Sequence, residues 1–382
     1  MRADRLQLRG YRNYQELALD FSPGANIFLG PNAQGKTNII EAVYYAALAR
    51  SHRTAKDQEL IGWEAEGAAM RLSFSRLSVA SRLDFLWQRG RRRRILLNGQ
   101  DIRPRELVGN FTAVLFSPED LYLIKGAPAG RRTFLDAEIS QSSPAYYHEL
   151  SRYQHLLQQR NALLKKIRDR EAGRDMLELW DGQLAASAAR LVFRRYLAVG
   201  RLSELARRCQ SRISGALENL ELAYELHRHS GDTAPLPWEG QELSPDSMTN
   251  RLEAWYNESM AKYREMDIAR AVTGLGPHRD DLLLTVNGVD LRAYGSQGQQ
   301  RTGALALKLA ELDFLREGVG EYPVLLLDDV MSELDAGRRK ELLAFLKREE
   351  IQTLITATDR AYFPAESFGE FFSVSAGQVR PM

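Results

Sequence analysis

The stretch Gly30-Pro31-Asn32-Ala33-Gln34-Gly35-Lys36-Thr37 matches the phosphate-loop pattern G-x-x-x-x-G-K-[ST]. In such a loop the backbone N–H groups cradle phosphates, the lysine reaches the outer phosphates, and the hydroxyl takes a place on Mg²⁺. These last two roles fall to Lys36 and Thr37. The sequence therefore predicts a site for a nucleoside triphosphate and Mg²⁺.

The residues around this loop have the order that the loop requires. Residues 25–29 read as a short buried strand, and residues 38–48 have the apolar spacing of a helix. A helix N-terminus directed at the loop favours bound anions, because its free N–H groups and its dipole are positive there. This setting favours a phosphate site over a chance glycine-rich turn.

The composition sets broad limits on the chain and its partners. Its 382 residues suffice for two or three domains, and its 52 basic and 50 acidic residues leave a net charge of +2. Any contact with nucleic acid must therefore come from a local basic patch. The single cysteine, Cys209, excludes an internal disulfide and suits a reducing compartment. No signal-peptide core and no apolar run of about 18 residues is evident, so we expect a cytoplasmic protein with no membrane partner.

Two asparagine-glycine turns indicate antiparallel strands beside the parallel nucleotide-binding sheet. The first, Asn98-Gly99, follows strand candidates at 71–77, 83–87 and 95–97, and the second is Asn287-Gly288. This dipeptide fits the tight turns of hairpins. The fold class that we predict is α/β with mixed sheets.

The middle of the chain has a helical pattern. Residues 144–217 contain no proline after the first, and apolar side chains recur at spacings of three and four, with a break near 171–174. This predicts two long helices folded back as a hairpin. Many Arg and Gln on the other faces favour an exposed arm over a helical element buried on several sides. A strand at 220–226, a loop at 229–245 and a helix over 246–266 are expected to follow.

A second motif supplies carboxylates at the end of a buried strand. Residues 324–327, Val-Leu-Leu-Leu, are typical of a strand covered on both faces, and Asp328 and Asp329 follow directly. Open parallel sheets bind ligands at this carboxyl edge. We assign Asp328 to Mg²⁺, through water, and Asp329 to the orientation or deprotonation of the attacking water. The alternative, two capping aspartates in a turn, fits the upstream phosphate loop less well.

A third motif, Gly295-Ser296-Gln297-Gly298-Gln299-Gln300-Arg301, precedes a helical run from 302 to 314. Small residues that open a helix leave N–H groups free, and together with the helix dipole these make a second anion site. Alone, such a loop is also typical of a flexible Gly/Gln turn. Its place between the phosphate loop and the two aspartates, with Ser332-Glu333-Leu334-Asp335 beyond them, favours the anion site.

These motifs in this order resemble the ABC-type ATPase heads of chromosome-maintenance and double-strand-break-repair proteins. More closely, the chain resembles the RecF family of bacterial recombination mediators, and the resemblance extends over essentially the whole chain. The further stretches that carry it are 8–14, 116–121, 131–136 and 276–282.

The resemblance implies an ABC-type ATPase head with an inserted helical arm. It divides the chain into a lobe with the phosphate loop (1–140), the arm (141–266), and the part with the signature and the aspartates (267–382). It implies ATP as the nucleotide and a head-to-tail homodimer that sandwiches each ATP between one phosphate loop and one signature. The residues expected to bind the nucleotide are Gly30, Pro31, Asn32, Ala33, Gln34, Gly35, Lys36, Thr37, Arg12, Asn13, Ser296 and Gly298. Those expected to act in hydrolysis are Lys36, Asp328, Asp329, Ser296 and Gln299, with Thr37 and Asp328 on Mg²⁺.

The resemblance also implies the activity and the partners. We expect slow, DNA-stimulated ATP hydrolysis, ATP-dependent dimerisation, and binding to double-stranded DNA and single-strand/double-strand junctions. With RecR- and RecO-like mediator proteins, such a protein helps to load recombinase at gaps in DNA repair, replication and the SOS response to DNA damage.

Three departures from the wider ABC pattern favour a slow switch over a fast motor. The catalytic position, usually Glu, is Asp329, whose side chain is one methylene shorter. Thr358 occupies the position where other ABC heads have a histidine, and no equivalent of the usual glutamine loop is evident near 116–118.

Several basic runs are candidates for DNA contacts. Phosphate contacts need Lys or Arg, whereas no base-reading motif is evident, so recognition is expected to follow the backbone and the shape of the junction. Each run, taken alone, is also typical of a solvated basic face. The candidates are Arg50, Arg53, Arg89, Arg91, Arg92, Arg93, Arg94, Arg131, Arg132, Lys165, Lys166, Arg168 and Arg170.

Two other function classes stay open at this point. An ATPase subunit coupled to a nuclease shares this head, but only residues 360–382 follow Asp359, and no spare carboxylate cluster is evident. A transport ATPase fits the phosphate loop, but the long helical insertion and the missing histidine argue against it.

Overall fold

The computed structural model describes residues 1–215, 217–348, 351–364 and 368–382. Its contacts divide the chain into two compact units, Met1–Asp120 with Leu305–Met382, and Leu121–Ala304. The boundary falls within helix α9 (Gln297–Val319). These units differ from the three predicted parts because residues 121–140 and 267–304 make their contacts within the second unit. The division of the head into lobes therefore stays a prediction.

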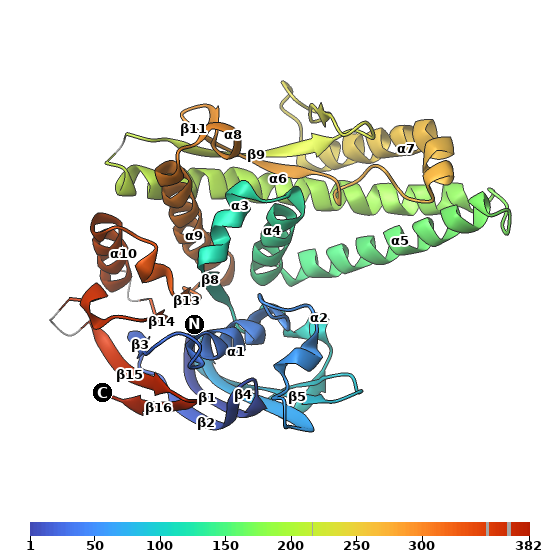
Figure 1. The fold of residues 1–382 in the computed structure, drawn as a ribbon. Helices are drawn as coiled ribbons and strands as arrows, with labels where there is room; N and C mark the ends of the chain where they lie inside the picture. The colour runs from blue at the N-terminus through green and yellow to red at the C-terminus, as the bar shows by residue number, and fades with distance from the viewer. Residues whose placement is uncertain (216, 349–350, 365–367) are drawn as a thin grey trace. The chain divides into compact units, whose positions relative to one another are not determined.

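A mostly parallel sheet of order β16-β15-β3-β14-β13-β8 organises the first unit (Figure 1). Strands β3, β13 and β14 are buried along their whole length, as expected for strands covered on both faces. The register places Thr356 opposite Asp328 and Ala357 opposite Leu29, so the carboxyl ends of these three strands lie at one edge. The strands are β3 (Ala25–Leu29), β8 (Ala113–Phe116), β13 (Val324–Asp328), β14 (Thr353–Ala357), β15 (Gly369–Ser375) and β16 (Gln378–Pro381).

An antiparallel sheet of order β2-β1-β4-β5-β6-β7 forms the other half of the first unit. The predicted hairpin turn is confirmed: Asn98 and Gly99, with φ of 52° and 88°, join β6 to β7, as a two-residue turn of the primed type requires. The strands are β1 (Arg2–Tyr11), β2 (Tyr14–Asp20), β4 (Gly67–Arg76), β5 (Val79–Gln88), β6 (Arg94–Leu97) and β7 (Gln100–Ile102).

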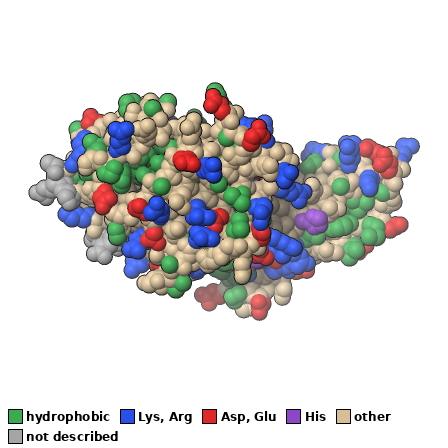
Figure 2. Space-filling view, turned by 90° about the horizontal axis from the view of Figure 1, so that it is seen from below, with side chains coloured by type: hydrophobic (Ala, Val, Ile, Leu, Met, Phe, Trp, Pro, Cys, Tyr) green, Lys and Arg blue, Asp and Glu red, His purple; other side chains and the backbone are tan. Residues whose placement is uncertain are grey.

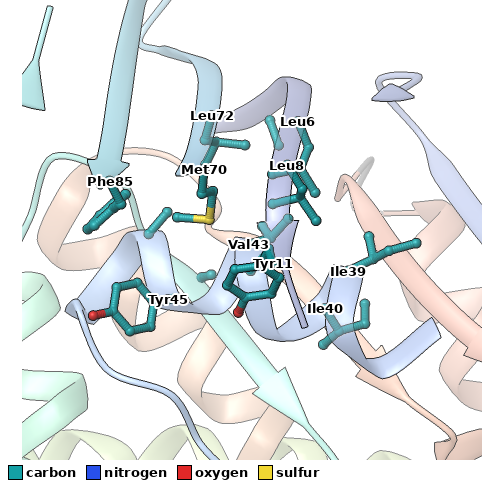
Figure 3. Packing of buried hydrophobic residues seen from close by; sticks show 14 of the residues in the cluster. Leu6, Leu8, Tyr11, Ile39, Ile40, Val43, Tyr45, Met70, Leu72 and Phe85 are labelled. Carbon is teal, nitrogen blue, oxygen red and sulfur yellow. The ribbon is translucent and has the colours of Figure 1, made fainter. Parts of the chain in front are cut away.

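Helix α1 (Lys36–Leu48) packs on the antiparallel sheet through apolar side chains. Each residue labelled in Figure 3 is at most 3% exposed. Burial of one such side chain stabilises the fold by about 1.5–3 kcal/mol, so this packing fixes α1 and with it the loop at its N-terminus. The labelled residues are Leu6, Leu8, Tyr11, Ile39, Ile40, Val43, Tyr45, Met70, Leu72 and Phe85. The other helices of the unit are η1 (Asp57–Leu60), α2 (Pro104–Leu107), η2 (Pro118–Asp120), η3 (Val330–Ser332), α10 (Ala336–Arg348) and η4 (Arg360–Tyr362).

The second unit contains the two predicted long helices, α5 (Pro144–Arg168) and α6 (Leu177–Ile213), with their break in the expected place. Helix α6 packs against α5, α7 and β9, so an element buried on several sides describes α6 better than an exposed arm. The predicted loop 229–245 holds one short strand, β10. The remaining elements are α3 (Leu121–Lys125), α4 (Pro128–Ser142), β9 (Leu220–His227), β10 (Thr233–Ala234), α7 (Pro245–Arg270), β11 (Asp281–Val286), β12 (Val289–Asp290) and α8 (Leu291–Tyr294).

A buried ion network joins α5, α6 and α7. Arg160, which is fully buried, donates to Asp181 and to Asp267, both at 2.7 Å. Removing one partner of such a network leaves an uncompensated buried charge, which costs about 3–5 kcal/mol. The network therefore fixes how the three helices pack. In the described ranges, no helix combines the length and the apolar composition needed to cross a bilayer.

Candidate functional site

The phosphate loop lies between β3 and α1, as predicted, and borders a cavity of about 430 Å³. The cavity brings the loop together with the residue that follows β13 and with one at the end of β14. The carboxyl edge of the parallel sheet is therefore the site. The lining residues are Asn32, Ala33, Gly35, Lys36, Thr37, Asn38, Arg53, Asp329 and Thr356.

Gly35 is required by its backbone and by its neighbours. Its φ is +111°, a conformation that residues with a side chain rarely adopt, and an added Cβ would lie 2.6 Å from Asn13 Nδ2 and 2.8 Å from Tyr14 Oη. Asn13 Nδ2 donates to the Gln34 carbonyl at 3.1 Å, and Tyr14 Oη donates to the Gly35 carbonyl at 3.1 Å. The turn between β1 and β2 therefore supports the loop directly, and Asn13 lies at the loop as predicted.

Lys36 lies folded over the loop. Its Nζ donates to the carbonyl oxygens of Gly30 and Pro31, at 2.6 and 2.8 Å. Burial lowers the pKa of Lys36, while the charges of Asp329 and Asp328 act to raise it. Among the described residues, the acceptors of the Lys36 ammonium are these two neutral carbonyls, and a phosphate would offer it a charge-assisted bond of about twice the strength.

Asp328 and Thr37 form the pair expected to hold Mg²⁺. Thr37 Oγ1 donates to Asp328 Oδ1 at 3.0 Å, and Thr356 Oγ1 donates to the same oxygen at 2.7 Å. Mg²⁺ usually binds through one or two carboxylates together with substrate phosphates and water. The hydroxyl of Thr37 and the carboxylate of Asp328 fit this mode of coordination. Within the described residues, no group of three or more His, Cys, Asp or Glu could hold a metal ion. An ion bound here would therefore also use oxygens of the nucleotide.

Asp329 has the features of a group that holds a water molecule. Its φ is +54°, its N–H donates to Thr356 Oγ1 at 2.9 Å, and its Oδ1 is buried with no hydrogen-bond partner among the described groups. Burial raises the pKa of Asp329, the charge of Lys36 opposes this shift, and Asp328 adds to it. An unpaired carboxylate oxygen with a raised pKa, on a residue that lines the cavity, suits general-base chemistry.

Thr356 is a site residue that the sequence did not reveal. Its hydroxyl donates to Asp328 and accepts the N–H of Asp329, so one side chain fixes both aspartates. The contact depends on the parallel register that pairs Thr356 with Asp328 across 28 residues. In the sequence Thr356 is one of two threonines in the strand 353–357, and nothing marks it out from Thr353.

Glu41 is a second residue that the sequence did not reveal. It is fully buried on α1 and accepts hydrogen bonds from Arg12 Nε and Nη2, at 2.9 and 2.6 Å, and from Ser51. Arg53 Nη1 lies 3.7 Å from Glu41 and donates to Asn38 Oδ1 at 2.8 Å. Burial acts to raise the pKa of Glu41, but the bonds from Arg12 and Ser51 and the two arginine charges lower it overall.

This ion cluster determines where two of the candidate residues lie. Arg12, expected at the nucleotide, directs its guanidinium to Glu41 and to the Glu59 carbonyl, and it does not line the cavity. Arg53, expected on a DNA surface, does line the cavity. Both arginines lie where they do because their guanidinium groups are attracted to the buried carboxylate of Glu41 on α1.

The other basic candidates differ in how available they are. Arg131 is only 3% exposed and forms a two-bond ion pair with Asp281 at 2.7 Å, so among the candidates it is not available to a DNA phosphate in this structure. Arg93 and Arg94 pair with Asp57 and Asp101. On the face shown in Figure 2, basic and acidic side chains are interspersed, in agreement with the small net charge.

The signature residues lie in the second unit, where α9 begins. The N–H of Ser296 donates to Gln299 Oε1 at 3.0 Å, and the N–H of Gln299 donates to Ser296 Oγ at 3.2 Å. This reciprocal pair is a capping box, and it explains why a serine and a glutamine three residues apart open the helix. Ser296 is exposed, and Gly298 lies in the first turn. Because these residues belong to the second unit, their approach to ATP stays a prediction.

Comparisons with known proteins show the family of this chain. A family model described as the RecF/RecN/SMC N terminal domain matches residues 3–377. The DNA replication and repair protein RecF of Exiguobacterium sp. is 42% identical, over 98% of this chain and 97% of that protein. RecF of Bacillus subtilis is 41% identical, over 92% of each chain.

Solved structures agree as well. The recombination mediator protein RecF with ATP, of the RecFOR pathway, has a TM-score of 0.88 and 34% identity, over 100% of this chain and 97% of that one. An SMC head domain from Pyrococcus furiosus, with a TM-score of 0.56 and 15% identity over 100% and 96%, shares the fold. The chain therefore belongs to the RecF family of DNA replication and repair proteins, a family of ABC-type ATPases.

Proposed function

We propose that this chain is an ATP-gated, DNA-binding recombination mediator that acts in the cytoplasm. On binding ATP and Mg²⁺ it dimerises, holds double-stranded DNA beside single-strand gaps, and helps RecR- and RecO-like proteins to load recombinase. The observation that carries this proposal is the cavity in which the phosphate loop, Lys36 and Asp329 meet. The solved relative that contains ATP and belongs to the RecFOR pathway supports ATP as the nucleotide and mediation as the role.

The residues of the cavity divide the work of binding and hydrolysis. Lys36 leaves its two carbonyl partners for the outer phosphates, and the N–H groups of the loop hold the others. Thr37 and Asp328 hold Mg²⁺, which supplies charge neutralisation of the phosphates. Asp329 accepts a hydrogen bond from the attacking water through its buried Oδ1, which has no partner among the described groups. Thr356 keeps both aspartates oriented during the step.

Dimerisation completes the site in this proposal. The capping box of α9 places Ser296 at an exposed helix N-terminus, where free N–H groups and the helix dipole attract phosphate. Ser296 of the partner subunit would then contact the outer phosphate of ATP bound at Lys36. Hydrolysis removes that phosphate and weakens the dimer.

Slow turnover follows from the residue that acts as base. Asp329 is one methylene shorter than the glutamate that is usual in such heads, so the water must be held at a greater distance or in a tighter cavity. A long-lived ATP state suits a protein that must stay on DNA while a recombinase is loaded. Within the described residues, no carboxylate cluster favours the alternative of an ATPase coupled to a nuclease.

The test compares ATP binding and DNA binding in the same preparation. We would titrate a fluorescent ATP analogue, and then a labelled blunt duplex with and without ATP, into the wild type, Lys36→Met and Lys347→Met. Lys347 is an exposed lysine on α10 and controls for loss of charge. Wild type and Lys347→Met should bind the duplex more tightly with ATP than without it. Lys36→Met should fail to bind the ATP analogue, and its affinity for the duplex should not change when ATP is added. Equal duplex affinity of the wild type with and without ATP would refute the proposal.

A further inference from the structure

Trp63 is a tryptophan held in solvent by a fixed backbone. It is 99% exposed, whereas Trp87 and Trp238 are buried. It lies in a turn closed by a hydrogen bond of 3.0 Å from the N–H of Ala65 to the carbonyl of Gly62, and the N–H of Gly62 donates to the carbonyl of Gly10 on β1 at 2.8 Å. The backbone on each side of the indole is therefore held in place, while the side chain is almost fully exposed to solvent among the described residues. An exposed, positioned indole is a feature of binding surfaces.

Arg89 ties this turn to an arginine-rich segment. Its Nε donates to the carbonyl of Ala65 at 3.0 Å, and its Nη2 donates to the carbonyls of Gly62 and Trp63, at 3.1 and 3.3 Å. Its own N–H donates to the carbonyl of Glu66 at 3.2 Å. Arg89 follows the last residue of β5, so the segment 89–94 starts directly beside the Trp63 turn.

A cavity of about 490 Å³ lies next to this turn, and its charged lining is mostly arginine. Arg9, Arg91, Arg92 and Arg94 line it together with one acid, Glu66. Arg94 pairs with Asp101 at 2.7 Å, and Arg9 lies 3.7 Å from Glu16. Arg91 and Arg92 are exposed and form no ion pair with any described residue. Two arginines are thus available to an anionic ligand.

We propose that Trp63 and the arginines of this cavity bind single-stranded DNA, with the indole stacked on an unpaired base and Arg91 and Arg92 on neighbouring phosphates. Sequence-independent binding of single strands combines these same two elements, an aromatic platform and a basic groove. A duplex offers phosphates but keeps its bases stacked inside, so the indole adds affinity only where a strand is unpaired. This inference rests on the proposed function, and it assigns the recognition of the single-stranded side of a gap to the first unit.

The experiment measures the affinities of the full chain, with ATP, for labelled oligo(dT), for a blunt duplex and for a gapped duplex. Trp63→Ala should weaken oligo(dT) binding about 5- to 150-fold, the range for loss of one stacked base, and should also weaken binding to gapped DNA. Trp63→Phe should keep most of the affinity for oligo(dT). Neither substitution should change the affinity for the blunt duplex. The control is Leu77→Ala, which removes another exposed apolar side chain (58%) at the opposite end of the β4–β5 hairpin.

Two further measurements separate stacking from charge. Arg91→Ala/Arg92→Ala should weaken oligo(dT) binding and lower its salt dependence, whereas Glu66→Gln should strengthen it. Wild-type tryptophan emission should be quenched by unlabelled oligo(dT), and this quenching should be lost in Trp63→Phe.

Unchanged oligo(dT) affinity in Trp63→Ala would overturn the inference, and so would an equal loss for oligo(dT) and blunt duplex. If ATP does not change the affinity of the wild type for duplex while Trp63→Ala still weakens oligo(dT) binding, the proposed function is refuted. The single-strand site at Trp63 is then supported independently of it.

Discussion

Replacing Glu41 by Gln removes the charge that holds two arginines beside the nucleotide cavity. Glu41 is fully buried, and the Arg12 side chain is 19% exposed. Loss of one partner of a buried pair costs about 3–5 kcal/mol. Because Arg12 is partly hydrated and keeps its bond to the Glu59 carbonyl, we place the loss of local stability at about 2–3 kcal/mol, at or just below the lower limit of that range.

Hydrogen exchange of the α1 amides, followed by mass spectrometry, measures this loss without assuming that the two units unfold together. The Gln variant should exchange about 30- to 150-fold faster in α1. The matched control is Glu16→Gln, which weakens an exposed contact to Arg9 of 3.7 Å and should change nothing measurable. A factor of ten in exchange rate corresponds to 1.4 kcal/mol, so a threefold change corresponds to about 0.7 kcal/mol. An increase in the exchange rate of α1 below about threefold would therefore contradict this prediction.

The same carboxylate predicts a pH dependence. The pKa of Glu41 is lower in the folded protein than its ordinary value of 4.5. Its contribution to stability is therefore complete above that value and is lost as the pH falls through the folded pKa. Protection of α1 in the wild type should decrease on acidification below pH 4.5, and the Gln variant should lack this part of the decrease.

Three further changes test other parts of the structure. Thr356→Val removes the hydroxyl bound to Asp328 and should destabilise the first unit by about 1–3 kcal/mol, measured by hydrogen exchange of the β14 amides. The same variant should release phosphate more slowly than the wild type at saturating ATP. Gly35→Ala, whose Cβ would contact Asn13 Nδ2 at 2.6 Å, should abolish binding of a fluorescent ATP analogue while circular dichroism keeps its shape. Burial raises the pKa of Asp280 to about 6, above the ordinary 3.8, so its contribution to stability is present below the ordinary value and lost as the pH rises to 6. Urea denaturation should therefore show that Asp280→Asn gains stability relative to the wild type between pH 4 and 6, and an unchanged difference would contradict this.

Motifs whose chemistry is local were predictable from the sequence. The phosphate loop needs only a strand before it and a helix after it, and both are evident from a few residues on each side. The Asn98-Gly99 turn needs positive φ at both positions, which this dipeptide tolerates. The capping box of α9 is equally local, because it needs only a serine and a glutamine three residues apart.

Contacts that depend on register or burial were not predictable. Thr356 meets Asp328 only because β13 and β14 pair in parallel at one particular offset, and nothing near either residue encodes that offset. Arg53 and Arg131 look alike in the sequence as members of basic runs. Arg53 lines the nucleotide cavity, 3.7 Å from the buried Glu41. Arg131 is buried against Asp281, a carboxylate 150 residues away in the sequence.

ATP is expected to drive dimerisation through the phosphate loop of one subunit and the signature of the other. Sedimentation velocity of the wild type, Lys36→Arg, Ser296→Arg and Asp329→Asn, each with and without ATP and duplex DNA, tests it most directly. The wild type should dimerise with ATP, Asp329→Asn should remain a dimer for longer because it binds but does not hydrolyse, and the other two variants should stay monomeric. If all four proteins remain monomeric with ATP and duplex DNA, ATP-driven dimerisation is contradicted. A dimer of Ser296→Arg as stable as that of the wild type would contradict the role of the signature.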